Sequence, residues 1–152
     1  MGFLQKEIEK FFFIKQLEIL IKMVNVKEGL KYATTHEWLK VEGNIGIVGI
    51  SDYAQHELGE IVYIGFDEAV ESFKKGDDLV PIESHKSMDY VKAPVDGTLK
   101  EKNQKLEDNW EAVNKDPYGE GWIVKIEIKN SAQLSELMDA DAYKKYLDSI
   151  KK

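Results

Sequence analysis

The sequence predicts a mainly β domain that folds as a small sandwich or barrel and carries a helix at its C-terminal end. Short runs of β-branched and aromatic residues recur between residues 45 and 128, separated by turns that contain Gly or Pro. Residues 122–128 alternate between apolar and charged side chains, which indicates a half-buried strand. After residue 131 the apolar residues change to helical spacing.

The individual elements follow from local signals. Ser51 is a suitable cap for a short helix and Ser131 for the C-terminal helix, because a serine hydroxyl can accept from the first free backbone amides. The expected elements are a strand at 45–50, a short helix through residue 58, strands at 60–66, 79–84, 88–93 and from residue 98, a loop at 114–121, a strand at 122–128, and a helix from 131 to about 150.

Residues 1–27 are predicted to be an N-terminal extension, helical or disordered, ahead of a domain at 28–152. The segment 1–22 favours an amphipathic helix, although two apolar stripes compete. The apolar stretch 11–21 is too short to span a bilayer and contains Lys15 and Glu18, so a membrane segment is not expected. The other interpretation is that Met23 is the natural start. Without a credible targeting signal, we expect the protein in the cytoplasm.

Composition excludes several functions. Among 152 residues the net charge is −7, so a nucleic-acid partner is not expected, since phosphate binding needs a basic face. The chain has no cysteine, which rules out disulfides, thiolate nucleophiles and zinc–thiolate sites. It has no arginine, and its three histidines lack metal-ligand spacing. No nucleophile–base pair is recognisable, so we do not expect an enzyme.

The most distinctive position is Lys86, in the sequence His85-Lys86-Ser87 between two predicted strands. A lysine at the tip of a hairpin is exposed, but at a pKa of about 10.4 it is a poor nucleophile at neutral pH. It becomes useful when another enzyme acylates it, because acylation removes the charge and lengthens the side chain into a tether. For most hairpin lysines, however, the correct interpretation is a solvated turn residue.

Four segments in order resemble the H protein of the glycine cleavage system, over residues 30–147. They are THEW at 35–38, GISDYAQ and LGEIV within 49–62, ESHK with APVDG within 83–97, and NKDPYGEGW at 114–122. The resemblance implies a barrel-sandwich hybrid fold, related to lipoyl and biotinyl domains, and lipoic acid joined to Lys86 as an amide. It also implies a carrier rather than an enzyme.

The resemblance further implies the partners and the cycle. A glycine decarboxylase that uses pyridoxal phosphate loads an aminomethyl group on the arm, and a tetrahydrofolate-dependent aminomethyltransferase removes the methylene and releases ammonia. Dihydrolipoyl dehydrogenase then reoxidises the dithiol, and a lipoate ligase or octanoyltransferase attaches the group. The carrier would contribute effective concentration at each partner and shelter for the labile group.

By the same resemblance, the loaded arm folds into a cleft lined by Thr35, Glu37 and Glu57, where a carboxylate would favour a protonated amine. Turn capping is the alternative role for Thr35 and Glu37. Glu83 is assigned to recognition by the lipoylating enzyme, with simple solubility as the alternative. Three residues are expected to be structural, with a hydrogen-bonded ring or a core indole: His36, Trp38 and Trp122.

Two positions near the lysine depart from the family. The family carries an aspartate four residues after the lysine, where this chain has Tyr90, with Asp89 one residue earlier. Because neighbouring strand residues point to opposite faces, we expect Asp89 to face away from the usual carboxylate position. His85 replaces a small β-branched residue.

These departures leave other functions open. An H-like lipoyl carrier could relay lipoate to 2-oxoacid dehydrogenases or serve sulfur oxidation. A biotin carrier would have methionines on both sides of the lysine, which this chain lacks. An unmodified binding module, anchored through residues 1–22, is a third alternative.

Overall fold

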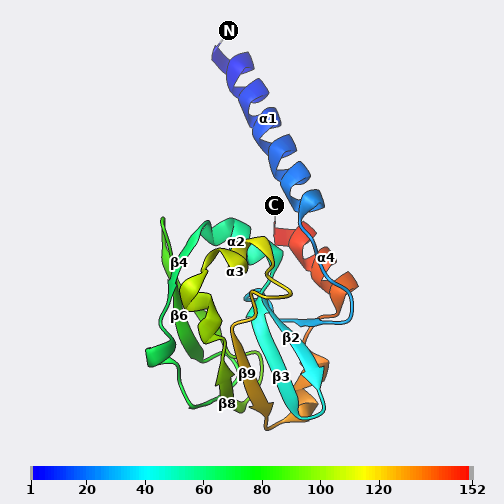
Figure 1. Ribbon diagram of the computed structural model, residues 1–152. Coiled ribbons are helices and arrows are strands. Elements are labelled where there is room, and N and C mark those ends of the chain that lie inside the picture. The colour runs from blue at the N-terminus through cyan, green and yellow to red at the C-terminus, as the bar shows by residue number, and fades with distance from the viewer. Residues whose placement is uncertain (1, 151–152) are drawn as a thin grey trace.

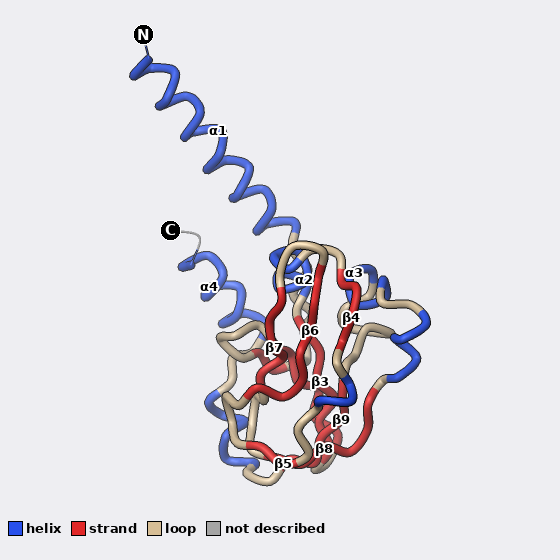
Figure 2. Tube along the Cα trace, turned by 90° about the vertical axis from the view of Figure 1, so that its left-hand side faces the viewer, coloured by secondary structure: helices blue, strands red, loops and turns tan. Residues whose placement is uncertain are grey.

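Two antiparallel sheets form the body, as expected for a barrel-sandwich hybrid (Figures 1 and 2). The computed structural model describes the backbone of residues 2–150 and the side chains of residues 4–16 and 24–150. The first sheet has the order β1 (Lys31–Tyr32), β2 (Glu37–Glu42), β3 (Ile45–Ile50), β9 (Val124–Ile128), β8 (Gly97–Lys102) and β5 (Ser72–Phe73). The second contains β4 (Ile61–Ile64), β6 (Asp78–Ser84) and β7 (Met88–Lys92).

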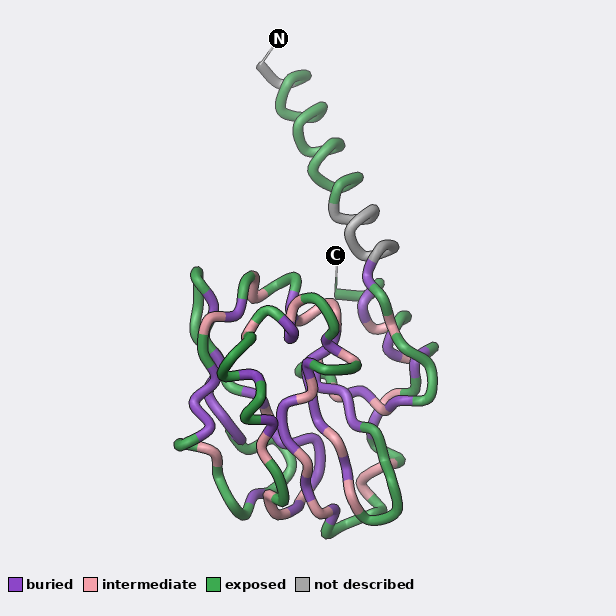
Figure 3. The backbone as a smooth tube through the Cα atoms, in the orientation of Figure 1, coloured by how far each residue is buried: buried purple, intermediate pink, exposed green. Residues whose placement is uncertain are grey.

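The core lies between these sheets, where buried side chains from both pack together, and Figure 3 shows the buried chain running through the body. A second cluster joins β1 and β2 to the C-terminal helix α4 (Ala140–Ile150). Its centre is a parallel stack of Tyr32 on Tyr143, with ring centroids 4.4 Å apart. Trp38 is 1% exposed in this cluster, as expected, and its Nε1 donates to the carbonyl of Pro117 at 3.0 Å.

Two short helices, α2 (Asp52–Leu58) and α3 (Glu111–Lys115), lie at the end of the body where the β6–β7 turn is found (Figures 1 and 2). The helix α2 begins as expected at Ser51, whose hydroxyl accepts from the backbone N–H of Ala54. The other short helices are the 3-10 helices η1 (Phe66–Glu68), η2 (Gln104–Asp108) and η3 (Ser131–Glu136).

Four sequence expectations need correction. The helix expected over 131–150 is divided into η3 and α4, because Tyr32 and Met138 exchange backbone hydrogen bonds between the two helices. Ser131 lies inside η3, whose cap position is occupied by Asn130. The expected loop at 114–121 begins with two residues of α3. Trp122 is half-buried, with Lys125 Nζ 5.1 Å from its ring centroid.

At the N-terminus, α1 (Gly2–Met23) is a helix that points away from the body (Figure 1). The predicted helix is present, but it is not amphipathic: the exposed apolar side chains of residues 4–14 lie all around the helix axis, beyond the two competing stripes that the sequence showed. Glu18 and Met23, which entered the sequence interpretation, have side chains outside the described set. Among described residues, no helix has the length and apolar character needed to cross a bilayer.

Candidate functional site

Lys86 lies at the tip of the predicted β6–β7 hairpin, in a turn that is closed by its own hydrogen bonds. The backbone N–H of Ser84 donates to the carbonyl of Ser87 at 2.8 Å. The Ser84 hydroxyl in turn accepts from the N–H groups of Lys86, at 3.3 Å, and Ser87, at 3.1 Å. These bonds fix the backbone of the tip and leave the side chain of Lys86 exposed.

The connection between α2 and β4 supports the tip from one side. His85 donates its N–H to the carbonyl of Glu60 at 3.1 Å, and its Nε2 is 3.4 Å from the Glu60 carboxylate. The methylenes of Lys86 pass beside Gly59, where a Cβ would lie 3.3 Å from Lys86 Cε. Gly59 has a φ of +85°, which disfavours any residue with a Cβ. The tip and α2 therefore form one unit.

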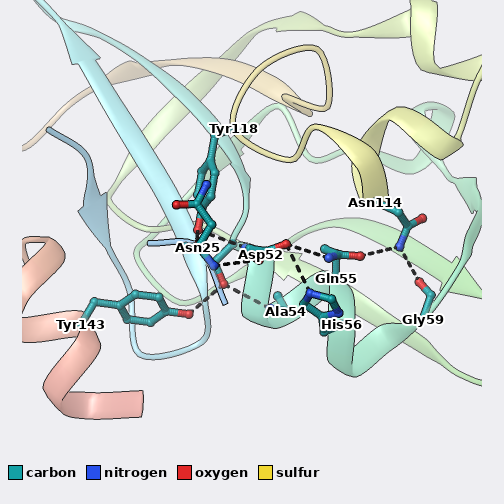
Figure 4. A network of polar contacts seen from close by, with 10 residues as sticks. Asn25, Asp52, Ala54, Gln55, His56, Gly59, Asn114, Tyr118 and Tyr143 are labelled. Carbon is teal, nitrogen blue, oxygen red and sulfur yellow. Dashed lines mark hydrogen bonds and ion pairs between the residues drawn. The ribbon is translucent and has the colours of Figure 1, made fainter. Parts of the chain in front are cut away.

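A chain of polar side chains fixes α2 itself (Figure 4). Asn114 donates from Nδ2 to the Gln55 side chain and to the carbonyl of Gly59, both at 2.9 Å. Gln55 donates to Asp52 at 2.7 Å, and Asp52 accepts the backbone N–H of Asn25 at 2.8 Å. The network therefore connects three parts of the chain: the segment that follows α1, the helix α2, and the helix α3. It also holds Gly59 beside Lys86.

Thr35 and Glu37 meet at a second location, at the start of β2. Glu37 is only 3% exposed, and its carboxylate accepts from the Thr35 hydroxyl and from the backbone N–H of Lys92, the latter at 2.9 Å. Burial raises the pKa of Glu37 from its ordinary value of 4.5 to about 7, although these two hydrogen bonds oppose the rise. The negative charge of Asp89 contributes to the raised pKa. The site is a buried carboxyl that can ionise near neutral pH.

The register of the hairpin shows which faces of the sheet Asp89 and Tyr90 occupy. Asp89 is opposite the buried Ile82 and therefore shares its face, whereas Tyr90 is opposite Pro81 on the other face. The two residues thus lie on opposite faces, as expected. Asp89 is nevertheless close enough for its charge to act on Glu37.

His36 separates Thr35 from Glu37 and has the structural role that we expected. Its φ is +80°, an uncommon value for a residue with a side chain. The ring Nδ1 is 2.8 Å from the hydroxyl of Tyr143, which also lies 2.7 Å from the Ser51 hydroxyl. Burial lowers the pKa of His36, which favours the neutral ring. This anchoring orients the residues on both sides of His36.

The other two candidate residues lie outside this pair. Glu57 is exposed on α2. Burial and then the charge of Glu57 raise the pKa of Tyr53, whose ring centroid is 4.8 Å from that of His36. The rings of Tyr53 and His36 thus lie between Glu57 and the Thr35–Glu37 site. Glu83 is exposed on β6, paired with Met88 across the hairpin.

Several groups that hold the site in place were not identified from the sequence. Asn114 gave no signal beyond its place in a turn-rich segment, and the N–H of Lys92 is invisible to side-chain patterns. The role of Ser84 could have been inferred, since serine at the start of a turn commonly accepts from backbone amides two and three residues ahead. Within the residues that the structure describes, no cluster of three possible metal ligands occurs.

Comparison with known proteins identifies the family of the chain. The family model described as Glycine cleavage H-protein matches residues 30–150. The chain is 46% identical over 121 residues to the glycine cleavage system H protein of Symbiobacterium thermophilum, covering 80% of this chain and 94% of the relative. It is 47% identical over 125 residues to that of Thermoanaerobacter sp. (strain X514), covering 82% and 98%.

A solved structure shows that the fold of this chain is also similar to that of a glycine cleavage system H protein. The crystal structure of a glycine cleavage system H protein from Mycobacterium marinum superposes with a TM-score of 0.71 at 26% identity, covering 84% of this chain and 100% of that one. The matched segment contains the hairpin and the Thr35–Glu37 site. The chain belongs to the glycine cleavage H-protein family.

Proposed function

We propose that the chain is the lipoyl carrier of a glycine cleavage system, with lipoic acid joined as an amide to Lys86. The observation that carries this proposal is an exposed lysine on a fixed hairpin tip, in a member of this family. When bound, the group supplies a disulfide that accepts the aminomethyl unit. The chain itself is a non-catalytic component that moves this unit from glycine decarboxylase to the aminomethyltransferase, and dihydrolipoyl dehydrogenase restores the disulfide.

The residues around Lys86 suit this attachment. Ser84 and the His85–Glu60 contacts hold the tip, so the flexible part begins at the lysine side chain. The missing side chain at Gly59 leaves room for the lysine methylenes. Glu83, one strand residue before the turn, is proposed to be read by the lipoate ligase or octanoyltransferase.

Glu37 and Thr35 are proposed to receive the loaded end of the arm. A protonated amine next to Glu37 stabilises the ionised carboxyl and lowers its pKa from about 7, so binding and ionisation support each other. Asp89 adds a second negative charge, and in this proposal it partly compensates for Tyr90 at the usual aspartate position. Glu57 is assigned to the α2 side of the same cleft.

Lipoylation in vitro tests the attachment. The purified full chain is incubated with lipoate ligase, lipoate and ATP, and then examined by intact mass and peptide mapping. Wild type and the control Lys100→Arg should gain one lipoyl group on Lys86, whereas Lys86→Arg should gain none. A lipoyl group on another lysine, or on none, would refute the proposal.

The pathway is tested on the lipoylated chain. With glycine and a bacterial glycine decarboxylase, the mass of the Lys86 peptide should rise by one aminomethyl group, and added aminomethyltransferase with tetrahydrofolate should remove it. A lipoylated chain that is never loaded would instead favour the alternative of an H-like carrier in another lipoate pathway, consistent with His85 and Tyr90. The cytoplasmic location and the domain boundary at residue 28 stay predictions.

A further inference from the structure

The helix α1 presents many apolar side chains to solvent. All the side chains that the structure describes on it, at residues 4–16, are exposed, and Figures 1 and 3 show this part of the helix standing clear of the body. The family model matches residues 30–150, so family membership assigns no role to α1. Exposed apolar surface of this extent normally marks a contact with another molecule. The apolar residues are between 41% and 62% exposed: Leu4, Ile8, Phe11, Phe12, Phe13 and Ile14.

Apolar side chains occur all around α1, but four of the six share one side. Leu4, Ile8, Phe11 and Phe12 recur at intervals of four, three and one residue. At 3.6 residues per turn, this spacing places them within a sector about 100° wide, which we call the α1 stripe. Phe13 lies nearly opposite the stripe. One side of α1 therefore has the width of a helix-packing surface.

The stripe is large enough for a stable contact between two copies of the chain. A Phe, Leu or Ile side chain that is about half exposed presents roughly 100 Å². The stripe and the adjacent Ile14 thus present about 500 Å² per copy, and the alkyl parts of neighbouring polar residues add to this. Two copies approach about 1,200 Å², the lower end of the range for specific interfaces. A second α1 matches the first in length and in apolar character.

The distribution of charge favours an antiparallel pair. Segment 2–23 contains four lysines and three glutamates, whereas the whole chain has a net charge of −7, so the body carries all of the net negative charge. Two bodies held side by side would repel each other. Antiparallel pairing places them at opposite ends of helices that are about 33 Å long, several times the Debye length of about 8 Å.

A membrane surface suits α1 less well than a second copy. A helix that lies on a bilayer binds anionic headgroups through a lysine-rich polar face. On α1, lysines and glutamates are nearly balanced, so this attraction is weak. The acidic body would also be repelled by anionic lipid.

We propose that α1 is a self-association element, in which the α1 stripe of one copy packs antiparallel against the α1 stripe of a second copy. The proposal needs only residues of α1, so it does not depend on a lipoyl group on Lys86. The pair would join two carrier bodies, each with its own exposed Lys86.

Light scattering during gel filtration, over a range of protein concentrations, measures the association of the full unlipoylated chain. The wild type should have twice the mass of the 17.4 kDa chain. Phe12→Lys should raise the dissociation constant at least about 100-fold, because each copy loses an apolar contact and buries a charge. Phe13→Lys makes the same change at an equally exposed neighbour outside the stripe, so it should leave the dimer intact. A chain that starts at Met23 should be monomeric.

Spin labels measure the orientation of the pair. Because the chain has no cysteine, Lys27→Cys provides a single labelling site on an exposed residue just after α1. Antiparallel helices should hold the two labels more than about 30 Å apart, whereas parallel helices would bring them within about 20 Å.

Four results would overturn the proposal. They are a monomeric full chain, a dimer that persists in the chain starting at Met23, equal weakening by Phe12→Lys and Phe13→Lys, and a short distance between the labels. A monomeric full chain that sediments with vesicles of anionic phospholipid would make α1 a membrane anchor instead. A dimer that is lost in Phe12→Lys and kept in Phe13→Lys, with distant labels, supports the proposal.

Discussion

Glu37→Gln should remove a pH dependence of stability that the buried carboxyl imposes. Because the pKa of Glu37 is about 7 in the folded protein and 4.5 without burial, the folded state binds more protons between these values. Stability from this group is fully present below pH 4.5 and is lost as the pH rises through 7. Between pH 5 and pH 8 the loss amounts to about 2.5 kcal/mol, at about 1.36 kcal/mol per pKa unit.

Glutamine preserves the local contacts while abolishing the titration. Its carbonyl oxygen can accept from the N–H of Lys92, and its amide can donate to the Thr35 hydroxyl, which accepts as well as donates. The variant should therefore fold as the wild type does. Only the charge that becomes buried at high pH is lost.

Urea unfolding at pH 5 and pH 8 measures the effect on the unlipoylated protein. The stability of Glu37→Gln relative to wild type should rise by about 2.5 kcal/mol between the two pH values. Glu42→Gln, an exposed glutamate at the other end of β2, should show no such change. A relative stability of Glu37→Gln that is the same at both pH values would refute the assignment of a raised pKa to burial.

Three further predictions concern the support of the site. Ser84→Ala should cost about 1 kcal/mol and speed hydrogen exchange at the amide of Lys86; unchanged exchange would show that the hydroxyl does not hold the turn. Asn114→Ala removes three hydrogen bonds and should cost about 2–3 kcal/mol in urea unfolding, with Asn114→Asp intermediate because it keeps the acceptor. A chain that starts at Met23 should unfold within about 0.5 kcal/mol of the full chain and be lipoylated at the same rate, since the described side chains of α1 are exposed; a larger loss would make α1 part of the folded domain.

The elements that the sequence predicted correctly are those with strong local signals. The hairpin around Lys86 has two β-forming runs and a short polar turn, and α2 has a serine cap followed by a compact helical stretch. These signals depend on residues only a few positions apart, so they survive without tertiary information.

The parts that could not be predicted depend on distant contacts. The break after η3 exists because Met138 bonds to Tyr32, more than a hundred residues earlier. The raised pKa of Glu37 requires its burial in the folded domain, where residues of β7 lie beside its carboxyl group. The periodicity of apolar residues within a segment does not indicate either contact. It also did not show that Trp122 is only half-buried.

The backbone hydrogen bonds between Tyr32 and Met138 also affect whether copies of the protein associate with one another. β1 is the outermost strand of the larger sheet, and an outermost strand with free backbone groups can recruit a strand from another molecule. Here Tyr32 donates to Met138 at 2.7 Å and accepts from it at 2.9 Å, so the C-terminal segment occupies that border. Loss of this segment would expose a template for self-association, and copies of the chain would then be depleted by aggregation.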